Sequence, residues 1–162
     1  MATEVDTSTL GGTSRSGLLS TLVSPAGTPA TTVETDLFTY TFPVSAFISS
    51  SAAIRLTFWY VTAANGNTKT VRVYFGGTLM SSRAVADNAA VQQWTVNILR
   101  VASNSQLSVT QKVTATAAGT SIELGSATIT ESTAIIIKVT GQNGTGTAND
   151  IQLRGATLEF LQ

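Results

Sequence analysis

The side chains that carry most enzyme chemistry are missing from this chain. Its 162 residues include no histidine and no cysteine. Without histidine, the commonest general base and the commonest transition-metal ligand are absent, and no Ser-His-Asp or Cys-His nucleophile can be assembled. Without cysteine, there are no disulfides and no thiolate metal sites. An enzyme that works with carboxylates or lysine stays open, but the composition favours a protein that is not an enzyme.

The carboxylates best placed to act together are Glu34 and Asp36, which stand two residues apart at the start of a predicted strand. At this spacing two side chains share one face of a strand, as a general acid and base or a cation site would require. Acidic residues at such a boundary usually stay solvated, and we favour that interpretation. The sequence therefore predicts no catalytic residue, no metal site and no cofactor.

The loop Gln142–Asp150 is a second place where a cation could bind, because it is rich in Gly, Asn and Thr. Oxygen-rich loops can hold Ca²⁺. This loop contains a single carboxylate, Asp150, and lacks the spacing of an EF-hand. Gly141 and Gly144 have G-x-x-G spacing, but no phosphate-loop lysine accompanies them. A structural turn is the favoured interpretation.

Two aromatic side chains and two arginines are predicted to face outward. Trp59 and Arg55 share the polar phase of one strand, and Tyr74 and Arg72 share that of the next. Such residues form either a contact surface between subunits or a platform on which a sugar ring stacks. Because aromatic and arginine side chains dominate protein interfaces, subunit packing is favoured over glycan binding.

The charge balance argues against several partners and for assembly. Nine basic and nine acidic residues cancel, whereas a nucleic-acid-binding protein usually carries a basic surplus. No apolar stretch approaches the about 20 residues that span a bilayer. Charged residues make up 11% of the chain, against about 25% in typical soluble domains. So few charges predict a surface that is partly buried in an oligomer or larger particle, with a Ser/Thr-rich soluble surface as the alternative.

Residues 1–34 differ in composition from the rest of the chain. They are rich in Thr, Ser, Gly, Ala and Pro, which disfavours a packed core. A simple linker has little need of large apolar residues, whereas an extended arm that binds a groove uses them as anchors. We therefore predict an N-terminal arm over 1–34 that binds a partner, with a free tail as the alternative. The predicted contact residues are Leu10, Leu18, Leu19, Leu22 and Val23.

Residues 35–162 show strand after strand with an alternating, period-two pattern of apolar residues. Asn65-Gly66 and Gly76-Gly77 mark reversals between strands, and a change of phase at Arg154-Gly155 predicts a β-bulge. The pattern predicts an all-β domain, an eight-stranded jelly-roll-type sandwich. The predicted strands are 36–42, 54–61, 70–75, 91–101, 107–115, 121–130, 134–140 and 150–161.

Three segments together resemble small jelly-roll domains from the virions of tailed bacteriophages. They are Asn67–Thr78 (NTKTVRVYFGGT), Trp94–Leu107 (WTVNILRVASNSQL) and Lys138–Leu161 (KVTGQNGTGTANDIQLRGATLEFL). The resemblance covers about residues 35–162 and leaves the arm outside it. It implies a virion component, commonly a homotrimer packed around a threefold axis, of the kind found in tail fibres, tail spikes and head-decoration proteins.

A domain that starts close to its own Met1, with only a short arm, suits a decoration protein better than a long fibre. The leading hypothesis is a trimeric capsid decoration (cement) protein on the capsid surface. Its arm would bind the major capsid protein or another virion protein. The alternative is a tail-fibre, receptor-binding or carbohydrate-binding module, in which Trp59 or Tyr74 would contact glycan. An enzyme, such as a glycan depolymerase, ranks last.

Overall fold

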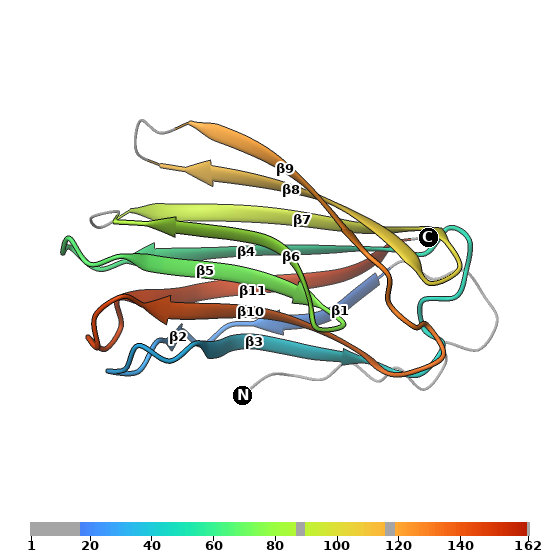
Figure 1. The fold of residues 1–162 in the computed structure, drawn as a ribbon, viewed down its shortest axis with the longest axis horizontal. Coiled ribbons are helices and arrows are strands. Elements are labelled where there is room, and N and C mark those ends of the chain that lie inside the picture. Colours follow the sequence, from blue (N-terminus) through green and yellow to red (C-terminus); the bar gives the residue numbers. More distant parts are fainter. Residues whose placement is uncertain (1–16, 87–89, 116–118, 162) are drawn as a thin grey trace.

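The structure is a computed structural model that describes residues 17–86, 90–115 and 119–161. Every regular element in this part of the chain is a β-strand, so the predicted all-β class is confirmed. No helix long and apolar enough to span a membrane occurs among these residues. The strands form two antiparallel sheets that face each other as a sandwich (Figure 1).

The larger sheet has seven strands in the order β1-β11-β4-β7-β8-β9, and β2 also pairs with β11. Its strands are β1 (Gly17–Leu22), β2 (Ala26–Gly27), β4 (Ala53–Thr62), β7 (Val91–Ala102), β8 (Ser105–Thr114), β9 (Thr120–Ala127) and β11 (Ile151–Leu161).

The smaller sheet has four strands in the order β3-β10-β5-β6. Its strands are β3 (Thr35–Phe42), β5 (Lys69–Phe75), β6 (Thr78–Val85) and β10 (Ile135–Asn143). Because this sheet is narrower, β8 and β9 extend the larger sheet toward one side, where β6 is the strand of the smaller sheet that meets them (Figure 1).

The described residues form eleven strands where the sequence predicts eight. All eight predicted ranges contain a strand, and β1, β2 and β6 are additional. β1 and β2 lie inside the segment predicted as an arm, where Gly, Ser and Pro obscure the strand signal. β6 lacks clean alternation, because its pairing with β5 shifts register and leaves both Met80 and Ser81 buried.

Aromatic side chains fill the space between the two sheets. Phe58 and Trp94 lie on neighbouring strands of the larger sheet with ring centroids 5.5 Å apart. Phe47 reaches from the segment after β3 and contacts Phe75 of the smaller sheet and Phe160 of the larger one. All five side chains are at most 2% exposed. Burial of such large apolar groups is the main stabilising contribution to the sandwich.

The predicted bulge at Arg154-Gly155 is confirmed, because the pairing of β11 with β4 shifts register between Leu153 and Gly155. The shift lets Leu153 and Ala156 both face the core. Gly155 lies beneath the ring of Trp59, and a Cβ at this position would come 2.6 Å from that ring. Glycine is therefore required here by the close approach of the indole.

Candidate functional site

The outer surface of the larger sheet is uncharged over β7, β8 and β9, with apolar side chains among Thr, Ser, Asn and Gln. Six outward apolar side chains, of which Val109 is half-buried and the others are exposed, form what we call the hairpin patch: Leu99, Leu107, Val109, Val113, Ile122 and Leu124. The strand registers make them neighbours, because Leu99 is paired with Leu107, and Val109 with Leu124. Ile122 and Leu124 are each 70% exposed. Side chains that are cross-strand neighbours on one face form one continuous surface.

The inward surface of β8 is polar, which is the reverse of the usual arrangement in a sandwich. Ser108, Thr110, Lys112 and Thr114 all point inward and are buried. Arg83 of β6 donates to the hydroxyl of Thr114 at 2.8 Å. The apolar positions of β8 consequently lie outside, although the alternation itself was predicted correctly.

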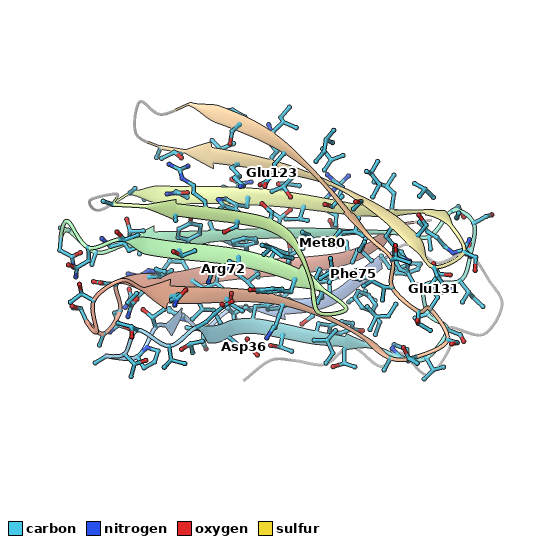
Figure 2. All side chains as sticks on the ribbon, in the orientation of Figure 1. Asp36, Arg72, Phe75, Met80, Glu123 and Glu131 are labelled. Carbon is cyan, nitrogen blue, oxygen red and sulfur yellow. The ribbon has the colours of Figure 1, made fainter. Side chains whose placement is uncertain are left out.

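On this inward side an ion pair joins β8 to β9, and both of its members form hydrogen bonds with β6. Lys112 Nζ lies 4.5 Å from the centre of the Trp94 ring, contacts the carboxylate of Glu123, and donates to the carbonyl of Ser82 at 2.8 Å. Burial alone would raise the pKa of Glu123, but hydrogen bonds from Lys112 and Ser81 outweigh it and hold that pKa below its usual value. Glu123 is labelled at β9 in Figure 2, and its carboxylate accepts from Ser81 of β6 at 2.7 Å.

The predicted outward residues lie on two opposite surfaces. Trp59 and Arg55 are on β4, on the outer face of the larger sheet, and Trp59 is 40% exposed. Tyr74 and Arg72 are on β5, on the outer face of the smaller sheet. The four side chains therefore cannot form one contact surface or one sugar platform. Alternation shows which residues share a face, but it does not show which sheet carries them.

Polar interactions link β3, β5 and β10 across the outer face of the smaller sheet. Arg72 Nη1 donates to Glu34 Oε2 at 2.8 Å and to Gln142 Oε1 at 2.9 Å, and Thr140 donates to the other oxygen of Glu34. Burial, together with a hydrogen bond to Glu34, raises the pKa of Tyr74 above its usual value. The phenol is therefore a neutral hydrogen-bonding group at physiological pH.

The predicted acid pair, Glu34 and Asp36, is divided between two cations. Glu34 pairs with Arg72, and Asp36 Oδ1 accepts from Lys138 Nζ at 3.0 Å. Among the described residues, no group of three or more acidic side chains could hold a metal ion. Both acids thus serve as ion-pair partners on this face.

The loop from Gln142 to Asp150 forms hydrogen bonds with its own domain. Asp150 is fully buried and accepts from the side-chain amides of Asn65 and Asn67 at 2.7 and 3.0 Å. Asn143 donates to the carbonyls of Pro29 and Thr147. These interactions agree with the structural turn favoured from the sequence.

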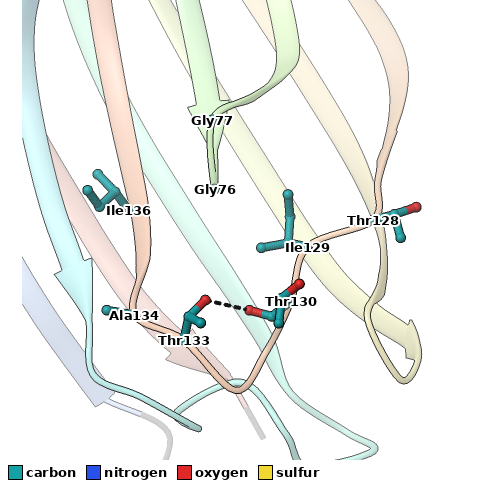
Figure 3. Close-up of a pocket in the computed structure, with 8 residues that line it drawn as sticks. All are labelled: Gly76, Gly77, Thr128, Ile129, Thr130, Thr133, Ala134 and Ile136. Carbon is teal, nitrogen blue, oxygen red and sulfur yellow. Dashed lines mark hydrogen bonds between the residues drawn. The ribbon is translucent and has the colours of Figure 1, made fainter.

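Two adjoining hollows, together called the small-sheet groove, lie beside the Gly76-Gly77 turn. The first, about 410 Å³, is walled by residues 128–136 (Figure 3), where the hydroxyl of Thr133 donates to the carbonyl of Thr130 at 3.0 Å. The second, about 270 Å³, shares Gly77 and Ile136 with it. The other residues around the second hollow are Asp36, Thr39, Tyr74 and Lys138. Hydroxyls, one ion pair and an aromatic ring line this groove, which suits a neutral polar ligand.

The residues predicted to bind a partner through the arm are divided by the structure. Leu19 is 8% exposed and belongs to the core of this same domain, whereas Leu18 and Val23 are 47% and 73% exposed. Leu22 is partly buried against the core, and Leu10 lies outside the described residues. Leu19 is thus occupied within its own chain, and partner binding by Leu18 and Val23 stays a prediction.

No known protein family and no curated protein matches this chain. Two solved structures share 12% and 11% sequence identity with it. A protein of unknown function from Shewanella oneidensis MR-1 gives a TM-score of 0.43, covering 98% of this chain and 84% of its own. The CBM2 module of the evolved Dit of Lactobacillus casei BL23 phage J-1 gives 0.37, covering 75% and 67%. At these TM-scores neither likeness identifies a function.

Proposed function

We propose that this chain is a non-enzymatic structural protein of a bacteriophage particle, an oligomeric decoration protein on the capsid surface. The pairing of β3 with β10 and of β4 with β11 wraps early strands against late ones, as expected of a jelly roll. We propose that the fold is a jelly roll and that the oligomer is a trimer. Its partner is the major capsid protein or another virion protein.

One observation carries the proposal: the N-terminal segment is anchored in the fold and still presents free apolar side chains. β1 pairs with β11 from Gly17 to Leu22. Leu18 and Val23, on this strand and just after it, are 47% and 73% exposed. Apolar groups held on a rigid strand bind a partner at a low cost in conformational entropy.

The mechanism is mechanical. A protein that binds the assembled shell, and not its separated subunits, stabilises that shell through binding linkage. Each copy would add contacts between neighbouring capsid subunits and so oppose the outward pressure of packaged nucleic acid. No group of this chain needs to react.

The test is co-sedimentation with capsid shells assembled without this protein. A chain lacking residues 2–16, and a full-length Leu18→Ser/Val23→Ser double variant, should each bind shells at least about tenfold more weakly, because burial of apolar area drives such docking. Val44→Ser is the matched control, because Val44 is 61% exposed in the segment after β3. Normal decoration of shells by both altered chains would contradict the proposal.

A second candidate function, glycan binding, is favoured by the small-sheet groove. Sugars bind through an aromatic face and several hydroxyl partners, and Tyr74 lines the groove beside Thr39. A glycan array should then give hits that Tyr74→Ala abolishes and Trp59→Ala, on the opposite sheet, preserves. An array without hits would rule this candidate out.

A further inference from the structure

We infer that the hairpin patch on β7, β8 and β9 is the surface through which two copies of this chain pack against each other. This inference rests on the proposed function, because it names the contact that would hold the decoration protein together as an oligomer. It is carried by the hairpin of β8 and β9, which faces its apolar residues to solvent and its polar residues to the core.

Specific contacts fix the pairing register that turns the apolar residues of β8 and β9 outward. Sliding β9 by one residue would turn Ile122 and Leu124 inward, but the contacts of Glu123 with Lys112 and Ser81 hold the observed register. Gly125 adds a steric restraint, because a Cβ there would lie 2.6 Å from the backbone carbonyl oxygen of Met80. The inward side is therefore shaped for small and polar groups, and the apolar side remains outside.

The patch is too apolar for a surface that stays in water. Ile122 and Leu124 are 70% exposed, and Leu99 and Leu107 are 40% and 38% exposed. A contiguous apolar surface of this kind marks an interaction site in a soluble protein. β9 is also the edge strand of its sheet. The described residues of β9 include no proline and no lysine, which often prevent an edge strand from pairing with another chain. An edge of this kind favours association.

A second copy fits this surface better than a charged partner does. The outward positions of β7, β8 and β9 that the structure describes carry no charged side chain; apart from the apolar ones, they hold Thr, Ser, Asn and Gln. A partner of opposite charge would find nothing to pair with. An uncharged patch needs no charged counterpart, so the patches of several copies can pack together around a symmetry axis, as the proposed trimer requires.

The size of the surface agrees with a stable contact between copies. With β4 included, the surface spans four strands about 4.8 Å apart, each about eight residues long at about 3.4 Å per residue. The flat area is therefore roughly 500 Å², and protruding side chains add to the accessible area. A stable interface buries about 800 Å² on each partner. The nearest charge is Arg55 of β4, which borders the patch: its Nε donates to Asn97 of β7 at 3.2 Å, and it forms an exposed pair with Glu159 of β11. This pair would belong to the polar rim of the contact.

The first test is the mass of the purified chain in solution by light scattering. Wild type should form an oligomer, and Leu124→Lys should lower the mass to that of the 16.8 kDa monomer, because it places a charge within the contact. Val44→Lys, at a site 61% exposed outside the patch, is the matched control and should keep the oligomer. Circular dichroism checks that each variant is folded.

The second test uses the absence of cysteine in the chain. Gln111→Cys places one thiol inside the patch and should cross-link two copies through a short bis-maleimide, whereas Thr41→Cys, exposed on β3, should not. A monomeric wild type, an oligomer that survives Leu124→Lys, or equal cross-linking by both thiols would each overturn the inference.

Binding of the chain to capsid shells tests the proposed function separately from the contact between copies. If wild type is a monomer and Leu124→Lys abolishes shell binding, the patch docks on a particle protein. The inference and the proposed trimer then fail, while decoration of the shell stands. If Leu124→Lys breaks the oligomer and no form of the chain binds shells, the inference stands and the proposed function fails.

Discussion

At the scale of single residues, Glu131 holds together the segment that walls the first hollow of the small-sheet groove. Arg100 Nε donates a bifurcated hydrogen bond to both oxygens of its carboxylate, each 2.9 Å from the nitrogen, and the side-chain amide of Gln106 donates another. Its backbone nitrogen donates to the side chain of Asn104. Glu131 and Arg100 are 4% and 14% exposed, so each charge depends on the other for compensation (Figure 2).

We predict that Glu131→Ala lowers the free energy of unfolding by about 3–5 kcal/mol, because it leaves the Arg100 guanidinium buried and unpaired. Glu159→Ala is the control: its carboxylate lies 4.0 Å from Arg55, and the two side chains are 40% and 46% exposed. This change should cost less than about 1 kcal/mol. Urea denaturation at pH 7 measures both; equal losses would show that burial of the pair is not what stabilises this region.

The roles of the charged residues were only partly predictable from the sequence. The sequence favours solvated side chains for Glu34 and Asp36, whereas in the structure they pair with Arg72 and Lys138. These two cations come from strands far along the chain. Glu131 was not singled out. Its partners Arg100 and Gln106 lie 31 and 25 residues away, and nothing in the local pattern indicates that separation.

At the scale of elements, β1 contains two adjacent leucines with different roles: Leu19 packs in the core and Leu18 lies at the surface. Leu19 is 8% exposed and packs in the core, whereas Leu18 is 47% exposed. We predict that Leu19→Ala lowers the free energy of unfolding by about 2–3 kcal/mol through the cavity it leaves. Leu18→Ala should change it by less than about 0.5 kcal/mol.

Thermal and urea unfolding of the two variants provide the measurement, and the identical chemistry of the two changes makes each the control of the other. Equal stability would mean that β1 is not part of the folded core. The same reasoning predicts that removal of residues 2–30 damages the fold itself, because it deletes β1 and β2. The shell-binding test therefore removes only residues 2–16.

Strand positions follow well from alternation, because a period of two and turn residues are local properties of the chain. The face that each strand turns inward is different. β8 alternates cleanly, yet Ser108 and Thr110 lie inside and Leu107 lies outside. That choice depends on β6 and on the pairing of Lys112 with Glu123, contacts that no pattern within one strand contains.

At the scale of the whole molecule, the scarcity of charge in the sequence corresponds to particular surfaces in the structure. Five ion pairs occupy most of the charged side chains in the described residues. The outer faces of β7, β8 and β9 are left with uncharged residues. The low charge content predicts that other chains cover part of the surface. The outer faces of β7, β8 and β9 are the part of the fold best suited to such a contact.

The pairing of β1 with β11 has a geometric consequence. Gly17 lies directly opposite Phe160, one strand spacing away, about 4.8 Å. Polypeptide joined ahead of Gly17 and polypeptide joined behind Leu161 would leave from the same rim of the sandwich. In a chain shortened to begin at Gly17, a few-residue bridge could close the backbone into a ring there, and a reporter fused at either end would stand at the opposite end of the strands from the Asn65-Gly66 turn.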